Sequence, residues 1–425
     1  MASPAPSVRA VKGMNDVLPG EIARWHRLEA LFRRSMALTG YREVRTPFVE
    51  HTPLFVRAIG EVTDVVEKEM YSFTRHRDEL SLRPEGTAGA VRAFVEHKVA
   101  NTEPVSRWYY LGPMFRAEQP QAGRYRQFWQ YGAECFGDAG PGSDAEMISE
   151  LCAFLAAAGV SAPRVLVNSI GGKGTRLAFT EAIRSFLEPK KAQLSELSQK
   201  RLEKNPLRIL DSKAPEDHEC LVGAPTLADV LDEADKDHFK NLLGHLDALG
   251  VAYEVDPKLV RGLDYYTRTL FEIKGDKEKL KAGDTLIGGG RYDGMVEELG
   301  GPSVPAIGFA GGLERLLIAT EEGPKEPYVS VFIAPMGGAA ITAALVLARE
   351  LRAAGVTTEV DTRGAQLKAM LRRASTIEAP FGVILGDSEL EAGLVELKDL
   401  NARTQEKVAR ADVVRILAER TKATP

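Results

Sequence analysis

Two aromatic-rich runs flank a short polar segment, and this arrangement leaves few ways to fold the surrounding chain. The runs are Arg107–Arg116 and Tyr125–Phe136, and the segment Gln119–Gly123 between them contains a proline and a glycine. Large aromatic side chains favour strands, whereas proline and glycine favour turns. The pattern predicts an antiparallel hairpin with a long tip, and therefore a sheet that is at least partly antiparallel.

Amphipathic helices are predicted before and after this hairpin. Apolar residues recur at helical spacing in Glu21–Leu38, and Gly40 follows at the position where a glycine often ends a helix. Ser143 and Glu146 form a capping-box pattern at the start of a second apolar stripe, which ends near Gly159. We expect this second helix to cover one face of the sheet.

At 425 residues the chain is too long for a single core. The middle of the chain differs in composition from the segments on either side of it. Residues 171–256 are rich in Lys, Glu and Leu and lack strand patterns, which predicts an inserted helical module. Strand patterns return at 267–273 and 306–311. Residues 1–170 and 257–322 are therefore expected to form one core that the module interrupts.

A polar hinge at Glu321–Pro324 separates this core from the end of the chain. Beyond the hinge, short β-rich runs alternate with helical segments, which is typical of α/β folds. We expect residues 328–425 to form a small α/β domain. The chain as a whole is thus assigned to the α/β class, with an α+β core in its first part.

Composition excludes several classes of protein. Hydrophobic residues make up 44% and charged residues 27%, close to the average for globular proteins, so disordered, collagen-like and membrane classes lose support. No apolar run approaches the length of a membrane span, and the first residues lack the apolar centre of a secretory signal, so we expect a cytoplasmic protein. Cys135, Cys152 and Cys220 are scattered, and neither they nor the histidines have metal-ligand spacing, so no metal site is expected.

The sequence lacks the glycine-rich loops that commonly bind phosphate. There is no GxxxxGK[ST] pattern, and the nearest imitation, Gly171–Thr175, has the wrong spacing. A GxGxxG pattern between a strand and a helix is also missing. Arginine is the alternative, because its planar guanidinium binds two phosphate oxygens and keeps its charge. Arg116, Arg261 and Arg315 are the candidates, although a single arginine is more often part of a surface ion pair.

Three segments resemble the motifs shared by class II aminoacyl-tRNA synthetases. Gly40–Pro47 with Thr52–Phe55 is similar to the first motif, which builds the dimer interface in that class. Leu111–Glu134 is similar to the second motif, and Ala306–Arg315 to the third. The resemblance covers essentially the whole chain.

More specific segments resemble signatures of the histidyl-tRNA synthetase family. These are Leu82–Thr87, Arg261–Tyr266 and Gly289–Gly294. The resemblance implies an antiparallel class II sheet flanked by helices, an inserted helical module and a C-terminal α/β domain that binds the anticodon. It also implies a reaction in two steps: ATP activates histidine as histidyl-adenylate with release of pyrophosphate, and the histidine is then transferred to the 3′ end of tRNA(His).

The resemblance implies roles for residues at the nucleotide. Arg116 and Arg261 are expected to be catalytic, one on each side of the α-phosphate that the histidine carboxylate attacks. Arg315 and Phe128 are expected to sandwich the adenine ring. The full set expected to bind ATP is Arg116, Glu118, Arg124, Phe128 and Arg315. Mg²⁺ is expected to be held mainly by the ATP phosphates and water.

The resemblance also implies a polar pocket for histidine. The expected residues are Glu85, Thr87, Gln130, Glu134, Tyr265 and Tyr266. The first three match positions that take the α-amino group in the family, and Glu134 with Tyr266 matches positions around the imidazole. Such a pocket rejects apolar analogues because they would leave its polar groups unpaired.

The partners implied are histidine, ATP, tRNA(His) and a second copy of the chain, with the homodimer formed near Pro47. The residues expected to contact tRNA are Gln121, Lys368, Arg372 and Arg373. Around Gln121 the loop carries Gln119 and Ala122, where many bacterial relatives place basic residues. Local basic clusters could form a tRNA-binding face even though the formal net charge is −5.

Two alternatives share much of this pattern. The regulatory subunit of ATP phosphoribosyltransferase has a similar core and binds histidine as a signal, but usually lacks the anticodon domain. A prolyl or threonyl enzyme of the same subgroup is the other alternative. The segment 328–425 disfavours the first, and Glu134 with Arg261–Tyr266 disfavours the second.

Overall fold

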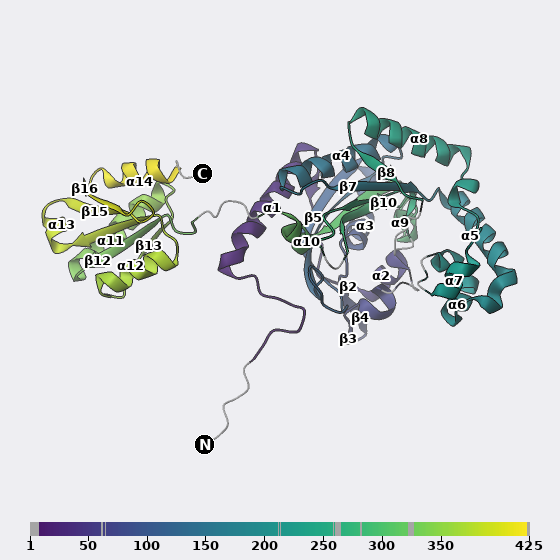
Figure 1. Ribbon diagram of the computed structural model, residues 1–425, viewed down its shortest axis with the longest axis horizontal. Helices are drawn as coiled ribbons and strands as arrows, with labels where there is room; N and C mark the ends of the chain where they lie inside the picture. Colours follow the sequence, from purple (N-terminus) through teal and green to yellow (C-terminus); the bar gives the residue numbers. More distant parts are fainter. Residues whose placement is uncertain are drawn as a thin grey trace, which may run out of the picture. The chain divides into compact units, whose positions relative to one another are not determined.

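The computed structural model describes residues 8–422, apart from 61–62, 64, 211, 213, 258, 260–264, 281–282 and 322–326. The chain divides into two compact units, Met1–Glu321 and Glu322–Pro425. Each unit contains its own sheet with helices packed on it (Figure 1). None of the helices in the described part of the chain is long and apolar enough to cross a membrane.

Antiparallel pairing dominates the main sheet of the first unit. Its described strands follow the order β1-β5-β6-β11-β10-β9-β7-β8. The bounds are β1 Arg42–Glu43, β5 Ser106–Phe115, β6 Gln127–Phe136, β7 Arg164–Ser169, β8 Tyr253–Val255, β9 Thr267–Lys274, β10 Thr285–Arg291 and β11 Ala306–Gly312. The edge strands β1 and β8 pair in parallel with β5 and β7. Strands β5 and β6 form the long antiparallel hairpin that the aromatic runs predicted.

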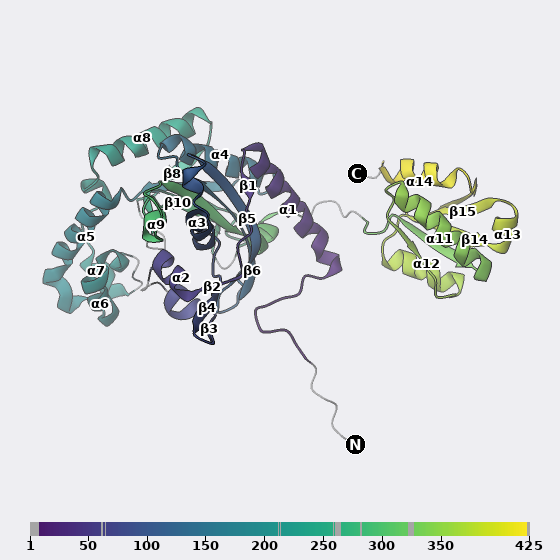
Figure 2. The same ribbon diagram turned by 180° about the vertical axis from the view of Figure 1, so that it is seen from behind.

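One face of this sheet is covered by helices α1 (Pro19–Leu38), α4 (Pro141–Ala157) and α8 (Glu233–Ala248), as Figures 1 and 2 show. Side chains alternate between the faces of a strand, and the residues that point to these helices are apolar. Phe32 of α1 lies at the centre of the resulting core, with its ring 5.1–6.3 Å from the rings of four neighbours. They are Tyr109, Tyr131, Phe154 and Phe309. The core therefore joins the first helix to the middle of the sheet.

In the described structure, helices cover the opposite face only at one end. There α2 (Thr52–Ile59), α3 (Thr87–Glu96) and α9 (Met295–Glu298) pack on it, and Phe94 stacks on Phe136 with ring centroids 4.3 Å apart. A small sheet beside α2 has the order β2-β4-β3, with bounds Val49–His51, Asp78–Leu82 and Ser72–Arg75. Toward the other end of the strands this face opens into a cavity.

The segment between β7 and β8 is mainly helical, as its composition predicted. Its elements before α8 are α5 Lys173–Leu187, η3 Glu188–Gln193, α6 Glu196–Lys204, η4 Pro206–Ile209, α7 Pro215–Cys220 and η5 Leu227–Asp229. They enclose a small core of their own, which includes Ile183, Leu187 and Ile209. The segment ends in β8, which is too short at three residues to give a recognisable strand pattern in the sequence.

The second unit is a small α/β fold. Its described strands follow the order β13-β12-β14-β15-β16. The bounds are β12 Val331–Met336, β13 Thr358–Val360, β14 Phe381–Gly386, β15 Leu394–Asp399 and β16 Thr404–Ala409, with helices α11 Gly338–Ala353, α12 Leu367–Thr376, α13 Asp387–Glu391 and α14 Val413–Lys422. Helices α11 and α14 pack on one face and α12 on the other. The first three strands are parallel neighbours joined by helices, which agrees with the predicted α/β domain, and the antiparallel pair β15 and β16 was not predicted.

The capping-box prediction at Ser143 is wrong. Helix α4 begins at Pro141, with Gly140 as its N-cap, so Ser143 lies in the first turn. Its hydroxyl donates to the carbonyl of Gly140 at 3.0 Å. Proline is well suited to the first helical position, because it has no N–H to leave unpaired there, and the helix therefore starts before the predicted cap.

We predict that Phe32→Ala lowers the free energy of unfolding of the first unit by about 3–5 kcal/mol, because it leaves a cavity among aromatic rings. Urea unfolding followed by tryptophan fluorescence measures this unit, since the three tryptophans, Trp25, Trp108 and Trp129, all lie in it. Leu38→Ala in the same helix is the control, because Leu38 is 76% exposed and should contribute less than about 1 kcal/mol. Equal losses in the two variants would contradict the prediction.

Candidate functional site

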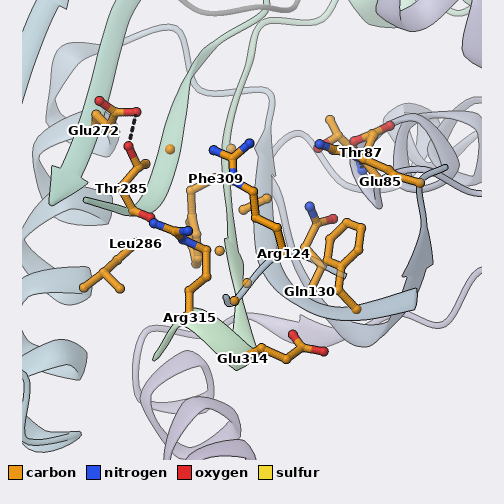
Figure 3. Close-up of a pocket in the computed structure, with 18 of the residues that line it drawn as sticks. Glu85, Thr87, Arg124, Gln130, Glu272, Thr285, Leu286, Phe309, Glu314 and Arg315 are labelled. Atoms are coloured by element: carbon orange, nitrogen blue, oxygen red, sulfur yellow. Dashed lines mark hydrogen bonds between the residues drawn. The ribbon is translucent and has the colours of Figure 1, made fainter. Parts of the chain in front are cut away.

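A polar cavity of about 260 Å³ opens on the uncovered part of the main sheet (Figure 3). Strands β6, β9, β10 and β11, the loop between β5 and β6, and the start of α3 contribute to its lining. The predicted site residues that line it are Glu85, Thr87, Arg116, Glu118, Arg124, Phe128, Gln130, Tyr265, Tyr266 and Arg315. The fold thus brings together residues that are separated by up to 230 positions in the sequence.

Glycines in the central strands leave room for the cavity. Across the sheet Gly308 pairs with Glu134 on one side and with Gly290 on the other, so these positions face the same way. A Cβ atom on Gly308 would lie 1.6 Å from a carboxylate oxygen of Glu134, and one on Gly290 would lie 2.9 Å from the ring of Tyr266. Side chains at these positions would displace the groups that line the site.

One end of the cavity is organised around Glu85, at the start of α3. Its two carboxylate oxygens accept hydrogen bonds from the backbone N–H groups of Thr87 and Ala88, at 2.7 and 2.8 Å. Gln130 lies beside it and accepts from the N–H of Gly86 at 2.9 Å. Burial raises the pKa of Glu85, although these backbone donors act against that shift. Each carboxylate oxygen has a further lone pair, which can accept a hydrogen bond from an ammonium group in the cavity.

Glu134 lies beneath the cavity surface and is fully buried. The hydroxyl of Tyr110 donates to one of its oxygens at 3.1 Å, and the hydroxyl of Tyr292 donates to the other. Burial raises the pKa of Glu134 to about 8. Tyr292 itself lines the cavity. Tyr292 lies in the segment Gly289–Gly294, for which the sequence indicated a family signature but no role for the tyrosine.

Tyr265 and Tyr266 both line the cavity, and their ring centroids are 4.5 Å apart. The ring of Tyr265 also lies edge-on to that of Tyr292, with centroids 5.7 Å apart. These rings form an aromatic wall near Glu134. Arg261, the second predicted catalytic arginine, lies outside the described residues.

Arginines dominate the other end of the cavity. Arg116 donates from Nε to the carbonyl of Pro84 at 2.9 Å, and its guanidinium carbon lies 5.4 Å from the centre of the Phe128 ring. Arg124 is 3.7 Å from a carboxylate oxygen of Glu118. Both arginines flank the loop that joins β5 to β6, where Arg116 N–H also bonds the carbonyl of Arg126.

Arg315, at the start of α10 (Leu313–Ala319), is fixed by backbone acceptors. Its Nε donates to the carbonyl of Thr285 at 2.7 Å and its Nη2 to that of Gly283 at 2.6 Å. Nη1 is buried and has no hydrogen-bond partner among the described residues. Figure 3 shows the guanidinium against Thr285, across the cavity from Glu85. The two backbone acceptors therefore fix the guanidinium in the cavity lining.

Sequence reasoning missed two carboxylates in the lining, Glu272 and Glu314. Glu272 accepts from the hydroxyl of Thr285 at 2.8 Å. Glu314 accepts from the N–H of Trp129 at 2.9 and 3.0 Å, and burial raises its pKa to about 7. Glu272 lies between the apolar residues Phe271 and Ile273 of β9. This alternation is a local signal that its side chain points away from the helix-covered core.

None of the residues predicted to contact tRNA is among those that line this cavity. Gln121 forms a β-bridge with Arg124 at the tip of the loop between β5 and β6. Lys368, Arg372 and Arg373 are exposed on α12 of the second unit, and Arg373 pairs with Glu359 at 2.6 Å. The N-terminal segment contacts this loop: the carbonyl of Gly13 accepts a hydrogen bond from the N–H of Arg126 at 2.7 Å.

The described part of the chain contains no group of three or more His, Cys, Asp or Glu side chains that could hold a metal ion. Cys135, Cys152 and Cys220 are free thiols. Near the arginines, the cavity lining also contains the carboxylates of Glu118, Glu272 and Glu314.

Comparison with known families matches residues 13–316 to Histidyl-tRNA synthetase and residues 330–420 to Anticodon binding domain. The chain is 57% identical over 418 residues to the histidine–tRNA ligase of Sorangium cellulosum, with 98% of each chain covered. It is 47% identical over 410 residues to that of Anaeromyxobacter dehalogenans, with 96% of this chain and 98% of the relative covered.

Two solved structures have a fold similar to that of this chain. The apo histidyl-tRNA synthetase of S. aureus superposes with a TM-score of 0.84 and 33% identity, covering 97% of this chain and 100% of that one. An ATP phosphoribosyltransferase regulatory subunit/histidyl-tRNA synthetase from Bacillus halodurans superposes with a TM-score of 0.66 and 22% identity, covering 90% and 99%. The second likeness, at that identity, concerns the fold alone.

We predict a pH-dependent difference in stability between the parent and Glu134→Gln. Because the pKa of Glu134 is about 8 in the folded protein and about 4.5 in the unfolded chain, the folded state keeps a proton that the unfolded state releases. The stability contributed by this group is fully present below pH 4.5 and is lost as pH rises through about 8.

The glutamine in Glu134→Gln cannot ionise, so the variant does not lose stability in this way. The Tm of Glu134→Gln minus the Tm of the parent should therefore increase as pH rises from about 4.5 to 8. Calorimetry at several pH values in this range measures the difference. Glu297→Gln, at an exposed position of α9, is the control for removal of a charge. A Tm difference between Glu134→Gln and the parent that stays constant with pH would show that Glu134 is ionised throughout.

Proposed function

The chain belongs to the histidyl-tRNA synthetase family, and on that basis we propose how its cavity activates histidine. As a histidine–tRNA ligase, the chain uses ATP to form histidyl-adenylate with release of pyrophosphate, and transfers the histidine to the 3′ end of tRNA(His). The observation that supports the cavity as the site is its lining: Glu85, Arg116 and Arg315 come from distant parts of the chain and face one cavity.

The α-amino group of histidine binds at Glu85, Thr87 and Gln130. Glu85 is held in one orientation by backbone donors, so it can accept from an ammonium group without first reorganising. Burial makes this carboxylate costly to ionise, and a bound ammonium group would offset that cost.

The imidazole binds at the opposite side of this pocket, near Tyr265, Tyr266 and Tyr292. Glu134 lies behind these rings and orients the Tyr292 hydroxyl. Through this hydrogen bond Glu134 fixes the Tyr292 hydroxyl as a polar partner for an imidazole nitrogen. Polar groups that face both ring nitrogens favour histidine over apolar amino acids, because an apolar side chain would leave these polar groups unpaired.

The reactive part of ATP binds at the arginine-rich end. Arg116 lies where its charge can hold both the α-phosphate and the attacking carboxylate of histidine, and Arg261 is assigned to the other side of the same phosphate from the sequence. The carboxylate oxygen attacks phosphorus as pyrophosphate leaves, so fixed charge matters more than a protein base. Mg²⁺ bound with ATP would supply positive charge to the outer phosphates, and Glu118 and Glu272 are lining carboxylates that would face it.

The adenine ring lies against Phe128, and Arg315 closes its other side. The position of Arg315 in the cavity lining, where the carbonyls of Thr285 and Gly283 hold its guanidinium, supports contact with the nucleotide. Arg124 is placed to meet the outer phosphates from the loop between β5 and β6.

The remaining assignments concern tRNA and the second subunit. Gln121 is placed at the acceptor end, and Lys368, Arg372 and Arg373 at phosphates near the anticodon. Residues 1–170 and 257–322 form the catalytic core, 171–256 the inserted module and 328–425 the anticodon domain. A homodimer forms near Pro47, where the apolar side chains of Phe48 and Val49 are 51% and 39% exposed.

ATP–pyrophosphate exchange with a panel of amino acids tests this function. Exchange should depend on histidine, and the same preparation should charge tRNA(His). A protein that binds histidine but gives no exchange would instead be a regulatory subunit. Preference for proline or threonine would assign it to another class II enzyme.

We predict that Arg261→Ala lowers the rate of histidine-dependent exchange by roughly 10²–10³-fold, because its charge acts mainly as the transition state forms. Histidine binding, measured by calorimetry, should be nearly unchanged. Arg164→Ala is the control, since Arg164 is a surface residue paired with Asp284 at 3.2 Å. Unchanged turnover in Arg261→Ala would remove this residue from the mechanism.

A further inference from the structure

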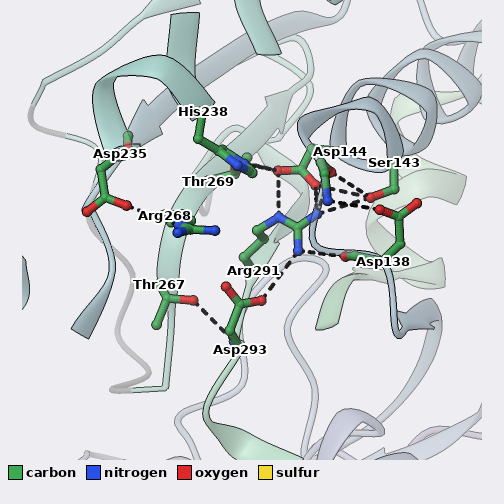
Figure 4. A network of polar contacts seen from close by, with 12 residues as sticks. Asp138, Ser143, Asp144, Asp235, His238, Thr267, Arg268, Thr269, Arg291 and Asp293 are labelled. Carbon is green, nitrogen blue, oxygen red and sulfur yellow. Dashed lines mark hydrogen bonds and ion pairs between the residues drawn. The ribbon is translucent and has the colours of Figure 1, made fainter. Parts of the chain in front are cut away.

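A buried polar cluster lies on the helix-covered side of the main sheet, away from the cavity (Figure 4). Its centre is an ion pair between Arg291 of β10 and Asp144 of α4, both with fully buried side chains. The two groups meet at two points, with Nη2 2.7 Å from Oδ1 and Nε 3.0 Å from Oδ2. None of the roles proposed above uses this pair.

Arg291 has its guanidinium satisfied by a set of fixed acceptors. Besides Asp144, they are the carbonyls of Asp138 and Gly140, the hydroxyl of Ser143 and the carboxylate of Asp293, at 2.6–3.3 Å. Replacing a buried ion pair with apolar groups is often neutral or stabilising, so stability alone does not explain why one is present. The network fixes the geometry of this part of β10.

Strand alternation connects this anchor to the cavity. Arg291 ends β10 opposite Ile307, which packs against the helices, and Tyr292 follows Arg291 directly. Because successive side chains point to opposite faces, Arg291 points to α4 while Tyr292 points to the cavity. The Tyr292 hydroxyl donates to Glu134, and its N–H donates to the carbonyl of Ala306 at 2.8 Å. Moving Arg291 would therefore move Tyr292.

Helix α8 completes the cluster from the inserted segment. Nε2 of His238 lies 3.1 Å from Oδ2 of Asp144 and 3.3 Å from the hydroxyl of Thr269, which donates to the same oxygen at 2.5 Å. Burial acts to raise the pKa of Asp144, but the hydrogen bond from His238 and the charge of Arg291 outweigh it, so the pKa is lowered. Asp144 is thus a charged junction between α4, β9, β10 and α8.

One turn earlier on α8, Asp235 makes a second connection. Its Oδ1 accepts from Nε of Arg268 at 3.0 Å, and its Oδ2 accepts from the N–H of Gly172 and the hydroxyl of Thr175, at 2.6 and 2.7 Å. Gly172 and Thr175 lie where the inserted segment begins. Asp235 and His238 together hold both the start and the last helix of the inserted segment against β9.

We propose that Arg291 is a positioning residue for the histidine end of the cavity, and that Asp144 and His238 make its placement depend on the docking of α8. This rests on the proposed function, which assigns Tyr292 and Glu134 to the imidazole. The position of Tyr292, which binds histidine in this proposal, is thereby coupled to α8, the helix of the inserted segment that packs on the other side of the sheet.

The first test is Arg291→Lys in the full-length protein, assayed by ATP–pyrophosphate exchange. Lysine keeps the charge but cannot satisfy the planar set of acceptors. We expect the KM for histidine to rise by about tenfold while the KM for ATP changes by less than about twofold. Arg164→Lys, at the surface pair with Asp284, should leave both values unchanged.

The second test is His238→Gln, which should raise the KM for histidine in the same selective way although the residue lies on the opposite side of the sheet. His245→Gln is the matched control, because His245 is an exposed histidine on the same helix. If Arg291→Lys fails to fold, this pair of variants decides the question. Equal KM values for histidine in the His238→Gln and His245→Gln variants would overturn the coupling to α8.

A double-mutant cycle with Tyr292→Phe tests whether these residues act through the tyrosine. The effects of Arg291→Lys and His238→Gln on the KM for histidine should nearly vanish once the Tyr292 hydroxyl is absent. Additive effects, or equal changes in the KM values for histidine and ATP, would overturn the proposal. The parent protein separates the two ideas, because its failure to give histidine-dependent exchange would refute the proposed function itself.

Discussion

The cavity depends on the absence of side chains at a few positions of the central strands. Gly132, Gly290 and Gly308 face the open side of the sheet, and a Cβ at any of them would lie within 3 Å of another residue. An antiparallel sheet normally fills such a face with side chains. Glycine instead lets Tyr110, Glu134 and Tyr266 lie over the backbone, and these groups provide much of the polarity and shape of the histidine end.

The electrostatics of the site follow from its burial. Burial raises the pKa of Glu85, of Glu134 and of Glu314, so each carboxylate is costly to keep ionised. Each is held by hydrogen bonds from backbone N–H groups or tyrosine hydroxyls, which fix its orientation before a ligand arrives. A site of this kind gains from a cationic ligand at one end, while the arginines at the other end favour phosphate.

The two faces of the sheet are not independent. Arg291 and Tyr292 are consecutive residues that serve opposite faces, one within the buried cluster around Asp144 and the other within the histidine pocket. Period-two alternation makes a strand a rigid connection between its two sides. The packing of the helices on one face therefore contributes to the precision of the pocket on the other.

Local patterns in the sequence determined the hairpin of β5 and β6, the helices α1 and α4, the α/β character of the second unit and the family, because each is encoded within a short stretch of chain. The arginines that could replace a phosphate-binding loop were also visible there. Only the tertiary structure decided that Tyr292 bonds Glu134, 158 residues away, and that Arg291 pairs with Asp144, 147 residues away. Contacts of this kind depend on strand order and register, which no local pattern specifies. The same reason explains why Glu314, whose partner Trp129 is 185 residues distant, carried no signal in the sequence.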